Sequence, residues 1–194
     1  MAFIAIDDIK TEIGMDLADT TYDSLLNNLS SAVIDLLDRL TNRTWVETEH
    51  TEYHNGAECY NIVLLKNYPV KSKAFVTLYD DPDWEYGNDT LIDAEDFQVD
   101  LERGIIYYNS RFFACNQNIK VVYTAGYTDT SFPSGYKQVL VRQAAHWFKQ
   151  ARNQEWDVSS KSNPSGSGSI SFAGLENNLL PDFKMMVEEE RRIQ

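Results

Sequence analysis

The spacing of apolar residues changes twice along this chain, and the order of the changes restricts the folds open to it. From residue 22 to 40 apolar side chains return every three or four positions, which predicts one amphipathic helix of about five turns. From residue 44 the spacing becomes two, which is typical of strands, and from 133 to 155 it returns to three and four. The sequence therefore predicts an α+β fold in which an antiparallel β region is inserted between helices.

Turn residues divide the central region into strands. Asn55-Gly56 predicts a hairpin between the first two strands, and Gly104 predicts a second hairpin. A short helix at 8–13 precedes the helix 22–40 and ends at Gly14. The expected strands cover residues 44–53, 58–65, 74–79, 97–101, 105–108 and 119–123.

A helical core is expected because the helices 22–40 and 133–155 are the strongest amphipathic elements and should pack on each other. The segment 158–169 has six serines and two glycines, which favours a mobile loop, and a C-terminal helix follows from Pro181. The predicted organisation is one α+β domain over 1–156 (1–43 helical, 44–130 mainly β, 131–156 the long helix), then a flexible loop and docking helix over 157–194.

Charge excludes some classes of function. The 194 residues have a formal charge of -13; residues 1–100 carry 21 acids against 6 bases, and the rest carry 9 against 11. A protein that grips nucleic acid or an anionic membrane needs a basic surface. No apolar run reaches the roughly 18 residues of a membrane span, and Asp7 and Asp8 interrupt the apolar start, so we expect a soluble chain made inside the cell without a signal peptide.

Two groups of residues resemble parts of metal sites. His50 and His54 share a strand face but lie about 13 Å apart, so they need a bend and Cys59 to hold one ion. Asp81, Asp83 and Glu85 precede Gly87, but the EF-hand spacing of Gly and Glu is absent. A solvated loop tip is the expected alternative for 80–89, and free thiols for Cys59 and Cys115.

Motifs for catalysis are absent from the sequence. It contains no G-x-S-x-G, P-loop, G-x-G-x-x-G or C-x-x-C pattern, and no carboxylate pair stands out by its spacing. His146 on the long helix is expected to be a core or interface histidine. We therefore predict a protein that is not an enzyme and that uses no cofactor or metal.

Several short stretches follow one another along the chain: RTW at 43–45, YPV at 68–70, FQVD at 97–100 and the sequence from VVYTAGY at 121–127 to AAHWF at 144–148. In this order they resemble the head–tail connector (head-completion or adaptor) proteins of tailed bacteriophages and of gene transfer agents. The resemblance covers nearly the whole chain, which is of the longer type with a strand-rich insertion. The motif residues are Tyr123, Thr124, Ala125, Gly126, Tyr127, Pro133 and Trp147.

This resemblance implies a structural role in the neck of a virion, assembled in the bacterial host cytoplasm. Such proteins form a ring of about twelve copies under the portal. The ring extends the DNA channel and joins the head to the next neck or tail protein, a stopper or tail terminator. DNA passes through without sequence-specific binding, and no membrane is involved.

The C-terminal appendage is the expected site for the portal or a neighbouring subunit. Its apolar residues and closing arginines suit an arm that orders on binding; the alternative is that this helix packs on its own domain. The predicted partner-binding residues are Phe172, Leu180, Phe183, Met185, Met186, Arg191 and Arg192.

The acidic first half has a further implication under this resemblance. DNA slides past an acidic wall, and acidic copies repel, so ring contacts should be apolar or use the near-neutral second half. Two other classes of function stay open: an acidic binding module for calcium or a glycan through 80–89, and a DNA mimic that inhibits a DNA-binding protein.

Overall fold

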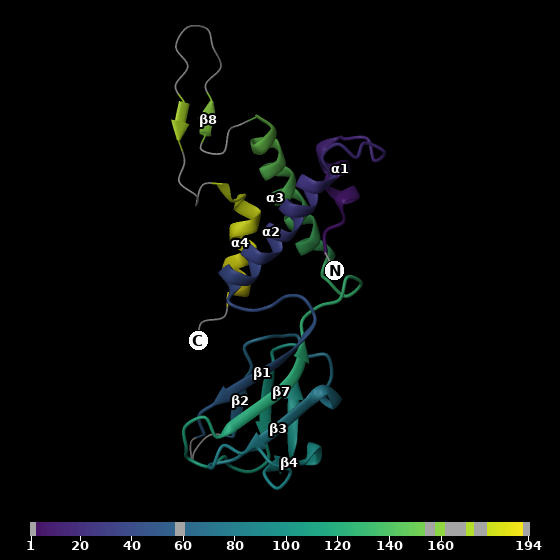
Figure 1. The fold of residues 1–194 in the computed structure, drawn as a ribbon. Coiled ribbons are helices and arrows are strands. Elements are labelled where there is room, and N and C mark those ends of the chain that lie inside the picture. The colour runs from purple at the N-terminus through teal and green to yellow at the C-terminus, as the bar shows by residue number, and fades with distance from the viewer. Residues whose placement is uncertain (1–2, 57–60, 154–157, 162–169, 173–177, 192–194) are drawn as a thin grey trace. The chain divides into compact units, whose positions relative to one another are not determined.

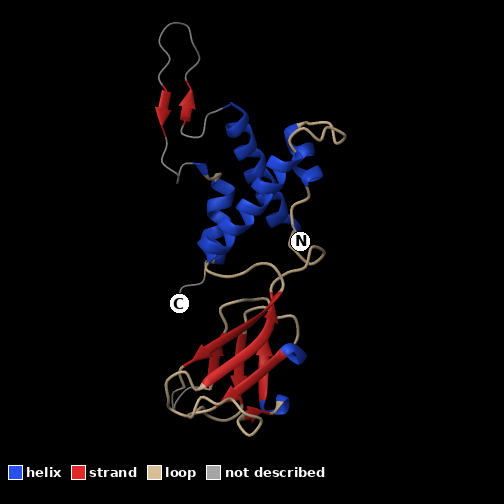
Figure 2. Ribbon diagram, viewed as in Figure 1, coloured by secondary structure: helices blue, strands red, loops and turns tan. Residues whose placement is uncertain are grey.

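The computed structural model describes residues 3–56, 61–153, 158–161, 170–172 and 178–191, and confirms the α+β class (Figure 1). Helices lie at both ends of the sequence and most of the strands lie in the middle (Figure 2). In chain order the elements are α1 Ile6–Ile13, α2 Asp23–Thr41, β1 Thr48–His54, β2 Ile62–Leu64, η1 Lys73–Phe75, β3 Val76–Asp80, β4 Leu91–Ile92, η2 Ala94–Asp96, β5 Phe97–Asp100, β6 Ile105–Tyr108, β7 Ile119–Ala125, α3 Ser134–Asn153, β8 Val158–Lys161, β9 Ile170–Phe172 and α4 Pro181–Glu190.

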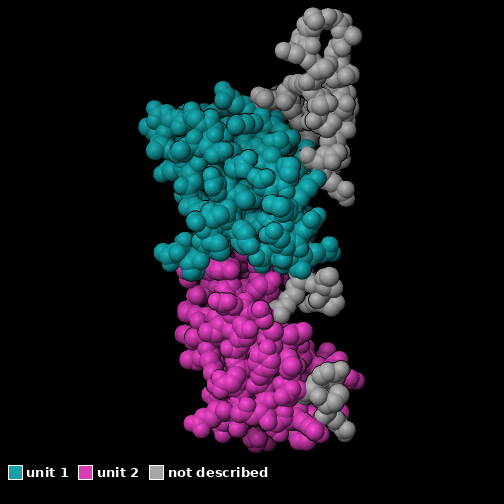
Figure 3. Space-filling view, turned by 180° about the vertical axis from the view of Figure 1, so that it is seen from behind, with its two compact units in different colours: residues 1–41, 129–194 teal, residues 42–128 magenta. Residues whose placement is uncertain are grey.

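The chain forms two compact units, coloured separately in Figure 3. Unit 1 comprises residues 1–41 and 129–194, and unit 2 comprises residues 42–128. Unit 2 is therefore an insertion in the sequence of unit 1, between α2 and α3. This arrangement explains why the apolar spacing changes near residue 44 and changes back near residue 133.

Unit 1 is a helical bundle in which α2 packs on α3, as the two amphipathic stripes predict. The helix α1 contacts both, and Gly14 ends it with a φ of 71°. Leu26, Leu37 and Phe148 are buried in the bundle. Lys10, also buried, pairs with Asp23 at 2.7 Å, so the only cation of α1 is neutralised by the first residue of α2.

Two expectations for unit 1 need correction at their edges. The long helix expected at 133–155 runs from Ser134 to Asn153, and the two residues beyond it lie outside the described residues. Residues 158–161, expected in a flexible loop, form strand β8, which pairs antiparallel with β9. The intervening residues 162–169 lie outside the described residues.

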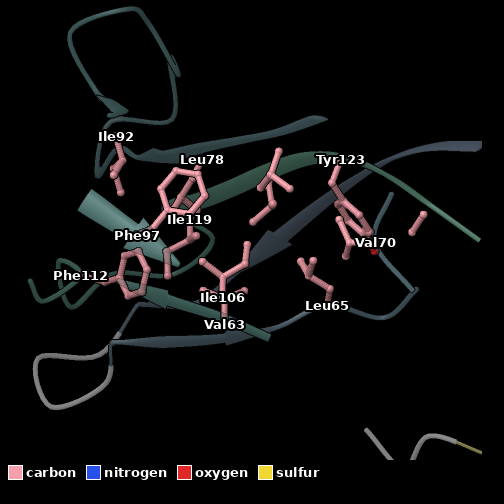
Figure 4. Close-up of a cluster of buried hydrophobic side chains, with 13 residues drawn as sticks. Val63, Leu65, Val70, Leu78, Ile92, Phe97, Ile106, Phe112, Ile119 and Tyr123 are labelled. Atoms are coloured by element: carbon pink, nitrogen blue, oxygen red, sulfur yellow. The ribbon is translucent and has the colours of Figure 1, made fainter. Parts of the chain in front are cut away.

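Unit 2 contains two antiparallel sheets with the strand orders β1-β7-β3-β4 and β2-β6-β5. The apolar cluster between them contains Ile119 and Leu78 from the first sheet and Ile106 and Phe97 from the second (Figure 4). Alternate residues of each strand point into this cluster, so the other residues form the two outer faces of the unit.

The hairpin predicted at Asn55-Gly56 is wrong. β1 pairs with β7, while β2 pairs with β6 in the other sheet. Gly56 donates its N–H to the carbonyl of Cys115 at 3.0 Å, and Asn55 accepts a hydrogen bond from the N–H of Gln117 at 2.8 Å. These contacts, across sixty residues, replace the local turn. The β5–β6 hairpin is confirmed, with Gly104 at a φ of 62°.

Candidate partner-binding surfaces

Helix α4 is anchored in unit 1 by apolar residues that the sequence suggested as partner contacts. Phe183 and Met186 are 0% and 3% exposed, and α4 contacts both α2 and α3. These two side chains therefore fill the core of the bundle. Met185 on α4 is 59% exposed, and Arg191, directly after the last residue of the helix, is also exposed, so both are open to a partner.

A buried polar network fixes the start of α4. Gln143 donates to the carbonyl of Asn178 at 3.0 Å and accepts from the N–H of Leu180 at 2.8 Å. Trp147 donates its indole N–H to the same Asn178 carbonyl at 3.2 Å, and Gln150 donates to the Asn178 side chain at 3.3 Å. Because buried backbone groups need partners, this network fixes where the chain turns into α4.

Two further contacts hold the outer side of α4 on α3. Arg142 forms an ion pair with Asp182, and the Tyr136 hydroxyl donates to Glu190 at 2.6 Å. Partner binding through the seven predicted residues stays a prediction. Of these, the side chain of Phe172 and all of Arg192 lie outside what the structure describes.

Three separated motif stretches converge in unit 2. The guanidinium of Arg43 lies 3.8 Å from the ring centres of both Trp45 and Tyr68, so it is stacked between two aromatic rings. Tyr127 stacks on Trp45 with ring centres 5.8 Å apart. The RTW, YPV and AGY stretches thus form one cluster at the residues where the chain begins and ends unit 2.

Gly126 is required by this cluster. Its φ is 106°, and a Cβ at this position would lie 2.7 Å from the backbone of Val46. Its N–H donates to the carbonyl of Pro69 at 2.9 Å, and Lys71 donates to the carbonyl of Thr124 at 2.9 Å. Ala125 is buried, paired with Thr48. These motif residues have a structural role in this fold.

Tyr123 belongs to a buried polar network on the inner side of β1. Its hydroxyl donates to Glu52 and accepts from the N–H of Asn67 at 3.1 Å. Burial, reinforced by the Glu52 carboxylate, raises the pKa of Tyr123 above its usual range. Burial would raise the pKa of Glu52 too, but hydrogen bonds from His54, Tyr123 and the Lys66 N–H lower it instead. Burial lowers the pKa of His50.

The two possible metal groups fit other roles here. Asp81 accepts hydrogen bonds from the N–H groups of Asp83 at 2.8 Å and Tyr86 at 2.6 Å, so its carboxylate organises its own loop. His54 lies 3.1 Å from Glu52, within the network of Tyr123. Across the ranges that the structure describes, no three His, Cys, Asp or Glu side chains are grouped to hold a metal ion. Cys59 lies outside those ranges.

The outer faces of unit 2 expose apolar residues that sequence analysis did not single out. In the three-stranded sheet Ile62, Leu64 and Tyr107 are 46%, 56% and 41% exposed. A signal was present: residues 62–65 read IVLL, an unbroken apolar run that strands buried on one side do not require. This face is a candidate surface for a partner.

Full-length structural similarity links this chain to chains of gene transfer agent (GTA) particles. One from the neck of an empty GTA particle computed with C6 symmetry has a TM-score of 0.60 at 14% identity, and covers 98% of this chain and 90% of that one. One from the virion of a native GTA particle gives 0.60 at 15%, with the same coverage. One from the neck of a native GTA particle computed with C12 symmetry gives 0.55 at 14%, covering 100% and 95%.

Comparisons at the level of sequence do not identify a family for this chain. No protein-family model matches the chain, and no curated protein matches it. The three structures therefore establish a shared fold that extends over both units. In the described ranges, none of the helices combines the length and apolar character needed to cross a membrane.

Proposed function

We propose that this chain is a structural component of the neck of a tailed-phage-like particle. The observation that carries the proposal is the similarity to neck chains over 98% to 100% of the chain, which includes the helical unit and its β insertion together. The order of the sequence motifs, which resembles that of head–tail connector proteins, supports the same role independently. Copies of the chain form an adaptor ring that joins the portal to the next neck or tail protein.

The distribution of charge supports a wall along which DNA slides. Between residues 80 and 102 there are ten acids and no lysine or arginine. Asp83, Glu85, Asp93, Glu95 and Asp96 are among those that are exposed. Because phosphates bind to cationic surfaces, a lumen lined by this segment lets DNA pass without holding it.

We propose that the exposed residues of the C-terminal helix and its end bind the portal. Met185 and Arg191 are exposed, whereas Phe183 and Met186 are buried in the bundle. Met185→Asp should reduce co-purification with portal about tenfold, because a central apolar contact contributes 1–2 kcal/mol or more. Leu17→Asp is the matched control, since Leu17 is exposed at 54% in the same unit. Equal binding by the two variants would remove α4 from the portal interface.

Deletion of the gene tests the role itself. The expected result is DNA-packed heads and separate tails in electron micrographs, with joined particles restored by the full chain supplied in trans. The control for complementation is the folded Met185→Asp variant, which should restore few joined particles. Normal joined particles from the deletion strain would refute the neck role.

A further inference from the structure

The two outer faces of unit 2 differ in character. The β2–β6 face consists of Ile62, Leu64, Ile105 and Tyr107, because Ile62 pairs with Tyr107 and Leu64 with Ile105. Their neighbours Val63 and Ile106 point the other way and are buried in the core. None of the four is charged, in a chain of net charge -13.

The opposite sheet has an aromatic outer face, the tyrosine face, made by Tyr53, Tyr79, Tyr86 and Leu91 around Lys120. Tyr53 and Tyr79 both pair with Lys120, and Leu91 pairs with Tyr79, so one row crosses all four strands. The ring of Tyr86 lies 5.6 Å from that of Tyr53. Tyr53 is 50% exposed and Leu91 is 40% exposed.

These two faces lie on opposite sides of one core, because each consists of the residues that alternate with its inward-pointing ones (Figure 4). A contact between different patches on opposite sides of one subunit repeats from copy to copy and closes into a ring when the rotation allows it. We infer that the β2–β6 face of one copy packs on the tyrosine face of the next. This inference rests on the proposed ring, whose contact surface it names.

Charge favours a second copy as the occupant. Copies of charge -13 repel, so they approach most easily through surfaces that lack acids. The four residues of the β2–β6 face fit this condition. Apolar side chains and tyrosine are also typical of the buried centre of a protein–protein interface. Exposed acids border the tyrosine face: Glu49 lies four residues along β1 from Tyr53, and Asp83, Glu85 and Asp89 share the loop of Tyr86. The β2–β6 face, whose four residues are uncharged, therefore meets this border with less repulsion than a second tyrosine face would.

Charge also favours unlike faces over like faces. The border of the β2–β6 face has Asp100, which pairs with Ile105. The tyrosine face has Lys120 at its centre, with its ammonium 5.1 Å from the Tyr86 ring and 5.5 Å from the Tyr79 ring. In the described chain Lys120 makes no ion pair. Packing the tyrosine face on itself would bring the central Lys120 ammonium groups of two copies together, whereas packing it on the uncharged β2–β6 residues avoids this repulsion.

Cysteine cross-linking between two tagged full-length chains tests this contact. Both chains carry Cys59→Ala and Cys115→Ala; one also carries Leu64→Cys on the β2–β6 face, the other Thr51→Cys beside Tyr53 on the tyrosine face. After co-expression and oxidation, the mixed dimer should exceed either like dimer about tenfold, the ratio that 1.4 kcal/mol of preference gives. One chain with both cysteines should form a ladder of higher oligomers. Leu17→Cys, exposed in unit 1, is the control.

Two results would overturn the inference. A dominant cross-link between two chains that both carry Leu64→Cys would mean a two-fold dimer. Mixed cross-links no more abundant than those of the Leu17→Cys control would mean that these faces bind something else. Adding Leu64→Glu to a chain with Thr51→Cys and Ile62→Cys should abolish its ladder without changing its melting temperature. The test distinguishes a failure of this contact from a failure of the neck role. If the neck role is wrong, the cross-links form but the chain is absent from particles. If only the contact is wrong, particles contain the chain but the cross-links do not form.

Discussion

Helix α4 and strand β2 are both short elements that carry apolar side chains, but these side chains meet different surroundings. The apolar residues Phe183 and Met186 of α4 are buried on the bundle of unit 1, and a polar network fixes its first residues. In β2 only Val63 is buried, while Ile62 and Leu64 on either side of it are exposed. The apolar residues of α4, at helical spacing, therefore pack into the core of their own unit. The apolar run that includes β2 alternates between buried and exposed residues.

The largest expected effect tests whether α4 belongs to the bundle. Phe183→Ala removes a fully buried ring and should lower the free energy of unfolding by about 3–5 kcal/mol. Met185→Ala, at an exposed neighbour, should change it by less than about 0.5 kcal/mol. Urea unfolding followed by circular dichroism measures both. Similar small losses would mean that α4 is an undocked arm.

A glycine pair tests the motif cluster of unit 2 against the helices of unit 1. Gly126→Ala places a Cβ against the Val46 backbone at a φ of 106°, and should cost about 2–3 kcal/mol. Gly135→Ala, near the start of α3, meets nothing within 4 Å and should stabilise by about 0.4–1 kcal/mol. Hydrogen exchange read peptide by peptide assigns each change to its unit. Faster exchange confined to unit 1 in Gly126→Ala would contradict the cluster's role.

Acid should weaken unit 2 in two steps. The pKa of His50 is lowered by burial, so stability falls once pH drops below the ordinary histidine value near 6.5, as the unfolded chain takes up the proton. The pKa of Glu52 is also lowered, so a second loss follows as pH falls through its ordinary value of 4.5. Unfolding measured from pH 8 to 3 should show both steps.

Two variants separate these steps. His50→Gln should reduce the step near pH 6.5, and the remainder belongs to His146 of unit 1, whose pKa is also lowered by burial. Glu52→Gln should reduce the lower step and also lower stability at neutral pH, because Tyr123 and Lys66 lose a charged acceptor. An unchanged pH profile in both variants would mean that the network of Tyr123 does not control the acid response.

The smallest expected effect concerns salt. Ring contacts through largely apolar faces between copies of charge -13 should tighten about two- to tenfold as salt rises from low to moderate concentration, because repulsion is screened within about 10 Å. Light scattering across a sodium chloride series measures this change. Assembly that dissolves as salt rises would mean that ion pairs, rather than the β2–β6 and tyrosine faces, hold the copies together.

Local patterns predicted the elements whose partners are close in sequence or whose period is long. The helices α2 and α3 followed from their apolar stripes, and the β5–β6 hairpin from Gly104. The hairpin at Asn55-Gly56 failed because its backbone groups bond to residues 115–118. That alternative is non-local, so a turn signal alone does not reveal it.

Site residues were harder to predict for the same reason. Apolar residues at three- and four-residue spacing, such as those around Phe183, look the same in a sequence whether they pack in their own bundle or against another protein. The network that decides it requires Gln143 and Asn178, which are 35 residues apart. Exposure of Ile62 and Leu64 depends on which strand β2 pairs with, and this pairing with β6 crosses forty residues.

Quantitative mass spectrometry of purified, DNA-filled particles from the source of this chain tests the neck role most directly. The proposed ring predicts a fixed stoichiometry of about a dozen copies per particle, recovered together with portal. Absence of the chain from finished particles would contradict the account.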